Sequence, residues 1–268
     1  MNQNHIKALS IQISLNGLSF CILNRSNNTI EQLHHKPLDK KSSPFDLLNQ
    51  LKEVFDTHID SNQAFDTITC IYQNELSCLV PDAYFDENNL ADYLKFNAKI
   101  LKTDYISYDS LSIDCKNVYV PLVNINNYIF ETFGSFDYKH ASTVLIETIL
   151  QKYHNDNEPT LFVNVNPTSF EIVCMNGDKL IFYNTFEYST KEDFIYYILF
   201  TIEQLELDTE TIKTVLSGSI NEDDALFGIL YKYVRFVELM DPKYGFDLSK
   251  IDLENADRHH FILLNSFN

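Results

Sequence analysis

Glycine is the residue type that most limits the chemistry open to this chain. Only 6 of the 268 residues are glycine, whereas an average usage of about 7% would give roughly 19. They are Gly17, Gly134, Gly177, Gly218, Gly228 and Gly245. Neither the GxGxxG pattern of dinucleotide and kinase loops nor the GxxxxGK[ST] pattern of a P-loop can be formed at this spacing. We therefore exclude an ordinary Rossmann dinucleotide site, a P-loop nucleotide triphosphatase and a protein-kinase loop.

Histidine and cysteine also lack the spacing of a metal or nucleophile site. His34-His35 and His259-His260 are adjacent pairs, and neighbouring residues on a strand point to opposite faces, so neither pair binds one ion unaided. No HExxH or GxSxG pattern occurs. The 5 cysteines form no CxxC pair and lie among apolar residues, which is typical of buried, reduced thiols. We expect no metal, while a cysteine–histidine pair brought together by the fold stays open.

The charge balance narrows the class of partner. The chain carries 38 Asp and Glu against 20 Lys and Arg, a formal net charge of -18. This charge repels a nucleic-acid backbone unless basic residues cluster, and no such cluster occurs. No apolar run approaches the length of a membrane span and no secretory signal pattern opens the chain. We expect a cytoplasmic protein with no nucleic-acid partner and no membrane insertion.

Hydrophobic periodicity predicts the elements that position these residues, and it alternates between the periods of strands and helices. Residues 8–14 and 18–23 alternate as two strands around a tight turn at Asn16-Gly17, a strong hairpin signal. Further strands are predicted near 30–38, 67–72, 76–80, 105–113 and 118–123, with helices after Ser43-Pro44, over 90–101 and over 142–153. The polar loop 154–159 is the most linker-like segment, and it divides the chain into halves 1–155 and 159–268.

The second half repeats the pattern of the first. Residues 13–23 match 163–173 without gaps at an offset of 150, so that Asn16 meets Asn166 and Ser19-Phe20 meets Ser169-Phe170. The second copy continues through a strand over 179–186, a helix capped by Thr190, and a strand at 214–216 that ends in Ser217-Gly218-Ser219. We predict a pseudo-duplicated α/β protein in which each half opens with a strand hairpin.

Two tandem halves led by hairpins, with a late strand ending in Ser-Gly-Ser, resemble the actin-like ATPase superfamily. That superfamily includes actin, heat-shock chaperones, sugar kinases and the actin-like proteins of type IV pilus assembly. The chain is also similar to an uncharacterised Bacteroidetes family of this fold, through stretches at 80–86, 92–97, 103–106, 117–121 and 186–194. The resemblance implies an actin-like, ribonuclease H-like fold with two hairpin-led halves around a cleft.

The same resemblance implies where a nucleotide would bind. Active members carry Asp-x-Gly in both hairpins, where the acid orders Mg²⁺-bound water and the turn amides surround the phosphates. Here the first hairpin offers Ser14, Asn16 and Gly17, and the second offers Asn164 and Asn166. An asparagine amide has no charge and no useful basicity, so it replaces neither an anionic ligand nor a base.

This chain retains part of one further superfamily element, the turn on the adenosine side of the nucleotide, because Ser217-Gly218-Ser219 resembles that turn. Loss of the metal-organising acids removes several kcal/mol of transition-state stabilisation from phosphoryl transfer. We therefore expect a vestigial site, no hydrolysis and no required cofactor, while weak Mg-ATP binding stays open. Our leading hypothesis is a non-hydrolysing protein-binding or scaffold module. The alternative is a nucleotide-binding ATPase or kinase-like switch whose acids come from elsewhere, for example Asp109 or Asp114.

Aromatic residues indicate where a protein partner would bind. Phe and Tyr supply 13% of the chain, and there is no Trp. Tyr196, Tyr197 and Phe200 follow Phe194 on one predicted helix, and four such rings cover most of its circumference. The helix is therefore central to the core or partly covered by a partner, and Tyr-rich patches suit interfaces. An unknown protein partner and self-association both stay open.

Overall fold

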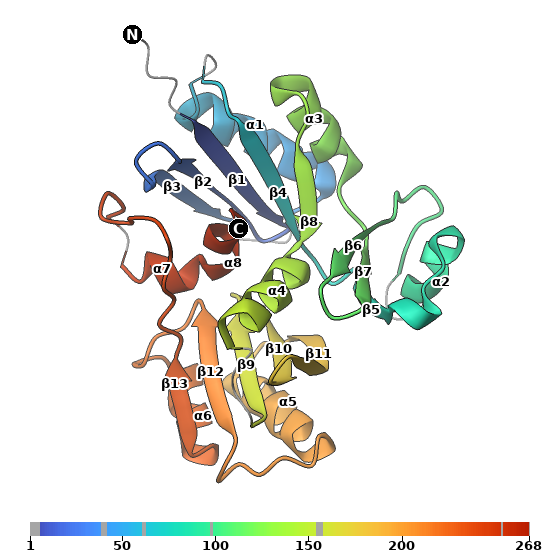
Figure 1. Ribbon diagram of the computed structural model, residues 1–268, viewed down its shortest axis with the longest axis vertical. Helices are drawn as coiled ribbons and strands as arrows, with labels where there is room; N and C mark the ends of the chain where they lie inside the picture. Colours follow the sequence, from blue (N-terminus) through green and yellow to red (C-terminus); the bar gives the residue numbers. More distant parts are fainter. Residues whose placement is uncertain are drawn as a thin grey trace. The chain divides into compact units, whose positions relative to one another are not determined.

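The computed structural model describes residues 6–38, 42–60, 63–96, 99–153, 158–252 and 254–267. The chain forms two compact units (Figure 1). Unit 1 comprises 1–145, 244–253 and 262–268, and unit 2 comprises 146–243 and 254–261. The sequence instead suggested halves at 1–155 and 159–268, and residues 154–157 of that linker lie outside the described residues. The three short or connecting helices are α4 (Ala141–Tyr153), α7 (Ala256–His259) and α8 (Phe261–Asn265).

Unit 1 is built on a five-stranded sheet of order β3-β2-β1-β4-β8. β1 pairs antiparallel with β2 and parallel with β4, β2 pairs antiparallel with β3, and β4 pairs parallel with β8. Its strands are β1 (Lys7–Ser14), β2 (Gly17–Asn24), β3 (Thr29–Pro37), β4 (Thr67–Gln73) and β8 (Asp137–His140).

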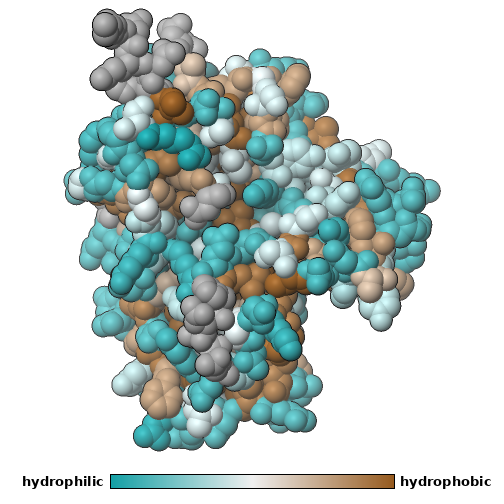
Figure 2. Space-filling model, viewed as in Figure 1, coloured by the Kyte–Doolittle hydropathy of each residue, from teal (hydrophilic) through white to brown (hydrophobic). Residues whose placement is uncertain are grey.

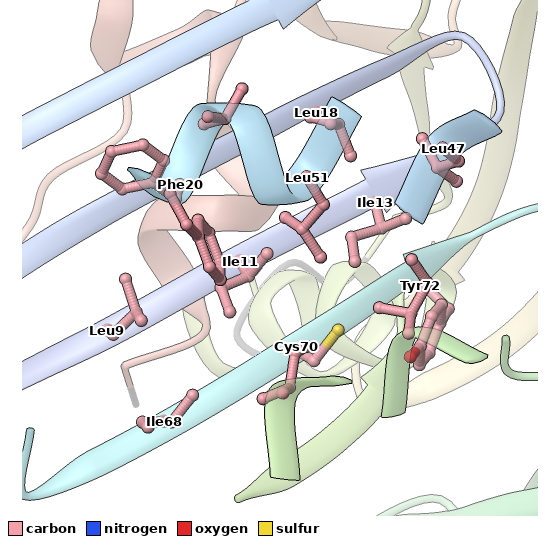
Figure 3. Close-up of a cluster of buried hydrophobic side chains, with 14 of the residues drawn as sticks. Leu9, Ile11, Ile13, Leu18, Phe20, Leu47, Leu51, Ile68, Cys70 and Tyr72 are labelled. Atoms are coloured by element: carbon pink, nitrogen blue, oxygen red, sulfur yellow. The ribbon is translucent and has the colours of Figure 1, made fainter. Parts of the chain in front are cut away.

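The main core of unit 1 lies between this sheet and the helices α1 (Pro44–His58) and α3 (Val123–Phe133). α1 starts where the sequence predicts, because the side chain of Ser43 accepts a hydrogen bond from the backbone N–H of Asp46 at 3.2 Å. Figure 3 shows the side chains of β1, β2 and β4 gathered around Leu47 and Leu51 of α1. The alternating residues Leu9, Ile11 and Ile13 of β1 face these helices, and Ala8 and Ser10 on the other face of the strand are buried as well.

A smaller sheet of order β5-β7-β6 is inserted between β4 and β8. Val80, Leu94, Val118 and Val120 form its own buried cluster. The helix predicted over 90–101 is shorter than expected, since it ends at Leu94 and residues 97–98 lie outside the described residues. The elements are β5 (Ser77–Pro81), η1 (Asp82–Tyr84), η2 (Glu87–Asn89), α2 (Leu90–Leu94), β6 (Ser107–Leu111) and β7 (Cys115–Tyr119).

Unit 2 repeats the sheet of unit 1, with the order β11-β10-β9-β12-β13 and the same strand directions. Helices α5 (Lys191–Gln204) and α6 (Ala225–Tyr233) cover one face of it. The duplication predicted from the sequence is therefore confirmed. The strands are β9 (Thr160–Val165), β10 (Ser169–Asn176), β11 (Lys179–Glu187), β12 (Lys213–Gly218) and β13 (Phe236–Leu239).

The hairpins of the two units correspond at a different offset from the one that the sequence match gave. Ser14 pairs with Gly17 in the first hairpin, and the N–H of Asn166 donates to the carbonyl of Ser169 in the second. The offset is 166 − 14 = 152 rather than 150. A shift of two residues keeps every side chain on the same face of its strand, so the alternation could not separate the two alignments.

The position of the first turn was also predicted wrongly. Leu15 and Asn16 form the turn, whereas Gly17 begins β2. Positive φ angles occur at Gly134, Gly177 and Gly218 among the described glycines, and not at Gly17. Asn16-Gly17 therefore does not form the hairpin turn with two positive φ angles that an Asn-Gly pair predicts.

Gly218 is the glycine on which unit 2 depends most. Its φ is +81°, and a β-carbon at this position would lie 2.1 Å from the carbonyl oxygen of Val165. The N–H of the next residue, Ser219, donates to that same oxygen at 2.7 Å. Only glycine allows the end of β12 to lie this close to β9.

We expect Gly218→Ala to lower the free energy of unfolding by about 2–4 kcal/mol, because it adds backbone strain and a steric overlap. The matched control is Gly245→Ala, where a β-carbon meets no atom within 4 Å and a change within about 0.5 kcal/mol is expected. Urea unfolding followed by circular dichroism measures both. Equal effects of the two substitutions would contradict the close approach at Gly218.

Candidate functional site

The first hairpin uses its polar groups internally. Ser14 Oγ donates to the carbonyl oxygen of Gly17 at 3.2 Å and accepts from the N–H of Asn16 at 3.2 Å. Gln12 Nε2 on the same strand donates to Gln73 Oε1 at 2.7 Å. Residues 12–19 include no Asp or Glu. Ser14, Asn16 and Gly17 thus lie together at this hairpin, with no carboxylate among residues 12–19.

A pocket of about 360 Å³ opens beside this hairpin, within unit 1. It is lined by the end of β1, the end of β4, the first residues of α1 and α3, and part of the segment 99–105. Most of its lining side chains are aliphatic or aromatic, and its charged ones are Glu75, Lys99 and Asp104. Two acids and one base disfavour a phosphate group, so the pocket is better suited to an apolar group.

The second hairpin brings together Asn164, Asn166 and Ser217, three of the residues singled out from the sequence. Asn164 Nδ2 donates to Glu171 Oε2 at 2.8 Å, and Asn164 Oδ1 accepts from Ser217 Oγ at 3.0 Å. Asn166 Nδ2 donates to the same carboxylate oxygen of Glu171 at 3.4 Å. Asn164, Glu171 and Ser217 are all buried. The hairpin therefore forms a hydrogen-bond network that is buried at Asn164, Glu171 and Ser217 and extends to the partly exposed Asn166.

Glu171 is the residue of this site that sequence reasoning missed. It lies on β10 directly opposite Asn164 in the strand pair. The available signal was a lone acid between the apolar residues Phe170 and Ile172. Burial raises the pKa of the Glu171 carboxyl above its ordinary value, and hydrogen bonds from Asn164, Asn166 and Tyr183 offset part of that shift. A cation would have to displace the amide groups that already donate to it.

The Ser-Gly-Ser turn is held by backbone contacts with β9. Ser217 donates to Asn164, while Gly218 and Ser219 lie against the carbonyl oxygen of Val165. The close approach of two strands therefore explains this glycine without a ligand.

Asp109, one of the two acids of the alternative hypothesis, is hydrogen-bonded to its neighbours in unit 1. Asp109 accepts hydrogen bonds from the N–H of His140 at 2.8 Å, from Thr143 Oγ1 at 2.7 Å and from the Tyr119 hydroxyl at 3.1 Å. Burial raises the pKa of Asp109, and these hydrogen bonds oppose the shift. Asp114 lies in the β6–β7 turn with a φ of 51°. Asp109 thus connects β6 to the start of α4.

The histidines and cysteines have packing contacts. His34 stacks on His58 at 4.0 Å between ring centroids, whereas His35 Nδ1 lies 2.8 Å from Ser19 Oγ, so the adjacent pair faces two ways. Within the described residues, no group of three or more His, Cys, Asp or Glu is arranged to hold a metal ion. No disulfide bond joins the five cysteines, and four of the five are buried. In the part of the chain that the structure describes, no helix has the length and apolar character needed to cross a membrane.

The three aromatic residues predicted as a partner face do not share one environment. Tyr197 is partly buried and stacks on Phe186 at 4.9 Å between ring centroids. Tyr196 and Phe200 are 60% and 45% exposed, and their rings stack on each other at 6.1 Å. Tyr197 therefore belongs to the edge of the core, and the other two face outward.

Glu171 gives unit 2 a specific pH dependence. A folded-state pKa above the ordinary value of 4.5 means that the folded chain holds this proton more tightly than the unfolded chain. The resulting stability is fully present below about pH 4.5 and is lost as the pH rises through the folded-state pKa. Each tenfold difference in proton affinity is worth about 1.4 kcal/mol.

Glu171→Gln removes this titration and keeps the shape of the side chain. We expect the free energy of unfolding of the variant, minus that of the native protein, to increase as the pH rises above about 4.5 and then to level off. Urea unfolding at a series of pH values from about 4 to 8 measures the difference, and contributions from other titrating groups cancel. A difference that is constant with pH would contradict the raised pKa.

Known proteins resemble this chain over nearly its whole length. A Bacteroides thetaiotaomicron protein, described as having an actin-like ATPase fold and unknown function, matches at 23% identity and a TM-score of 0.81, over 97% of this chain and 96% of the other. The PilM-PilN type IV pilus biogenesis complex matches at 11% identity and a TM-score of 0.61, over 97% of each chain. A polyphosphate/ATP-glucomannokinase from Arthrobacter sp. strain KM matches at 8% identity and a TM-score of 0.51, over 97% and 96%.

These similarities establish the fold and confirm the predicted resemblance to the actin-like ATPases. A comparison with curated proteins gives no match. The model of one family, described as a protein of unknown function (DUF3822), matches residues 1–237. The chain therefore belongs to the DUF3822 family and has the actin-like ATPase fold.

Proposed function

We propose that this protein is a non-hydrolysing member of the actin-like fold that acts by binding another protein, as a scaffold or adaptor. The observation that carries the proposal is the hydrogen-bond network around Glu171. Asn164, Asn166 and Ser217 occupy the second hairpin and its neighbouring strand end, and their side chains bond to one another or to Glu171. Polar groups used in this way are not available to a phosphate or a metal-bound water.

Phosphoryl transfer needs groups that this chain does not place at its hairpins. The reaction depends on positioning and on electrostatic stabilisation by metal ions and fixed dipoles. The first hairpin has no acid, and the second holds its one carboxyl in a buried network. Asp109, a candidate substitute, is bound by three donors within unit 1.

A role in protein binding has separate support. The PilM relative, which shares the fold, is described as part of a complex with another protein. Exposed aromatic rings at Tyr196 and Phe200 are typical of binding surfaces. The face shown in Figure 2 is mostly hydrophilic, with smaller hydrophobic areas. The absence of disulfide bonds among the five cysteines favours a reducing, cytoplasmic setting.

Calorimetric titration with Mg-ATP and Mg-ADP tests the proposal against the alternative of a nucleotide-dependent enzyme or switch. We expect no binding heat at millimolar nucleotide and no release of phosphate, because the first hairpin has no acid and the one carboxyl of the second is held in the buried network. The control is the same titration after urea unfolding of the sample, which reports dilution heat alone. Tight, Mg²⁺-dependent binding or phosphate release by the folded protein would contradict the proposal.

A further inference from the structure

The outer face of α5 carries two exposed aromatic rings between two acids. Glu192, Tyr196, Phe200 and Glu203 follow one another at i, i+4, i+8 and i+11, so they lie along one face of the helix. All four are exposed. Lys191, beside Glu192, is 4.0 Å from its carboxylate, which is the outer limit of an ion pair. The face therefore presents an apolar centre with negative ends.

The outer face of α6 has a glycine that the protein's own structure does not require. Gly228 lies in the middle of the helix, where glycine costs about 1 kcal/mol relative to alanine. It is exposed, and a β-carbon there would meet no atom within 4 Å. Tyr231, one turn further along, is 62% exposed and stacks on Phe227. A glycine in this place leaves room for close approach by another molecule.

These two outer faces lie on the same side of unit 2. Ile198 of α5 and Leu230 of α6 belong to one core cluster, which covers a single face of the β9–β13 sheet. Their outer faces therefore both point away from that sheet. The Glu171 network lies on the opposite face, because Glu171 alternates with the core residues Phe170 and Ile172 along β10. The helical surface is thus separate from the hairpin site.

The charge of this region indicates the chemistry of its partner. α5 contains Glu192, Asp193 and Glu203 against Lys191, a net charge of 1 − 3 = −2, whereas α6 contains Lys232 and no acid. A second copy of the chain would bring a like-charged surface and a net charge of -18 to the contact, which opposes self-association. A positively charged partner is attracted, and its cations also interact favourably with exposed tyrosine and phenylalanine rings.

We propose that the outer face of α5 and α6 binds a basic amphipathic segment of another protein. Apolar side chains of that segment contact Tyr196, Phe200 and Tyr231, its Lys or Arg residues pair with Glu192 and Glu203, and its backbone comes close to Gly228. This inference rests on the proposed protein-binding function and names the surface and the chemistry of the partner.

The test uses a fluorescent 18-residue peptide of Leu and Lys, with its apolar residues at helical spacing, and a second peptide in which Glu replaces Lys. Fluorescence anisotropy against the full chain measures both. We expect saturable binding of the basic peptide alone. Two double variants should each weaken binding of the basic peptide at least tenfold. One is Tyr196→Ser with Phe200→Ser, and the other is Glu192→Lys with Glu203→Lys. The matched control is Phe130→Ser with Glu131→Lys on α3, which makes the same kinds of change at another exposed site and should leave binding within twofold.

Gly228→Gln separates binding from folding. Glutamine is a better helix former than glycine, so the variant should melt at a higher temperature, while its side chain blocks close approach and weakens peptide binding. No binding by the native chain, equal weakening by the α3 control, or unchanged binding by Gly228→Gln would overturn the inference.

Two further outcomes are distinguishable from these. Light scattering that shows concentration-dependent assembly, abolished by Tyr196→Ser with Phe200→Ser, would overturn the inference in favour of a second copy as the occupant. Mg-ATP binding is measured without the peptide and reports on the other face of the sheet. If neither the peptide nor Mg-ATP binds, only the proposed surface on α5 and α6 is rejected. If Mg-ATP binds, the proposed non-hydrolysing function is rejected.

Discussion

A buried carboxyl group determines the chemistry of the second hairpin. Removing the charge of Glu171 from water is costly, and hydrogen bonds from neighbouring donors offset that cost. The side chains of Asn164 and Asn166 supply these donors, and Asn164 then accepts from Ser217 with its remaining oxygen. Three strands, β9, β10 and β12, are joined by this one network. The hairpin side chains thus help to hold the strands of unit 2 together.

The two-fold repeat could be predicted because it depends on alternation and on caps. Apolar residues on every second position of the strands and the Ser43 and Thr190 caps predicted the leading strands of each half and the helices α1 and α5. The offset between the hairpins could not be predicted, since a shift of two residues leaves the buried face unchanged. The position of the first turn could not be predicted either. Local composition favoured a turn at Asn16-Gly17, whereas the pairing of Ser14 with Gly17 places the turn at Leu15 and Asn16.

α3 was not predicted because its residues carry weak local signals. Its first turns are rich in asparagine, a poor helix former, and the preceding Leu122 provides no side-chain cap. Burial of Ile125 and Ile129, one turn apart, against the sheet of unit 1 stabilises the helix instead. Tertiary packing here overrides propensity. The candidate site could also be predicted only in part. The sequence identified Asn164 and Ser217, but only the strand pairing reveals that Glu171 lies opposite Asn164.

If the Glu171 network is structural, the side chains of Asn164 and Asn166 stay bonded to Glu171 whether or not a nucleotide is present. Nuclear magnetic resonance of the side-chain amides of Asn164 and Asn166 during addition of Mg-ATP tests it most directly. We expect both amide resonances to keep their positions up to millimolar Mg-ATP. Saturable movement of these two resonances that requires Mg²⁺ would contradict it.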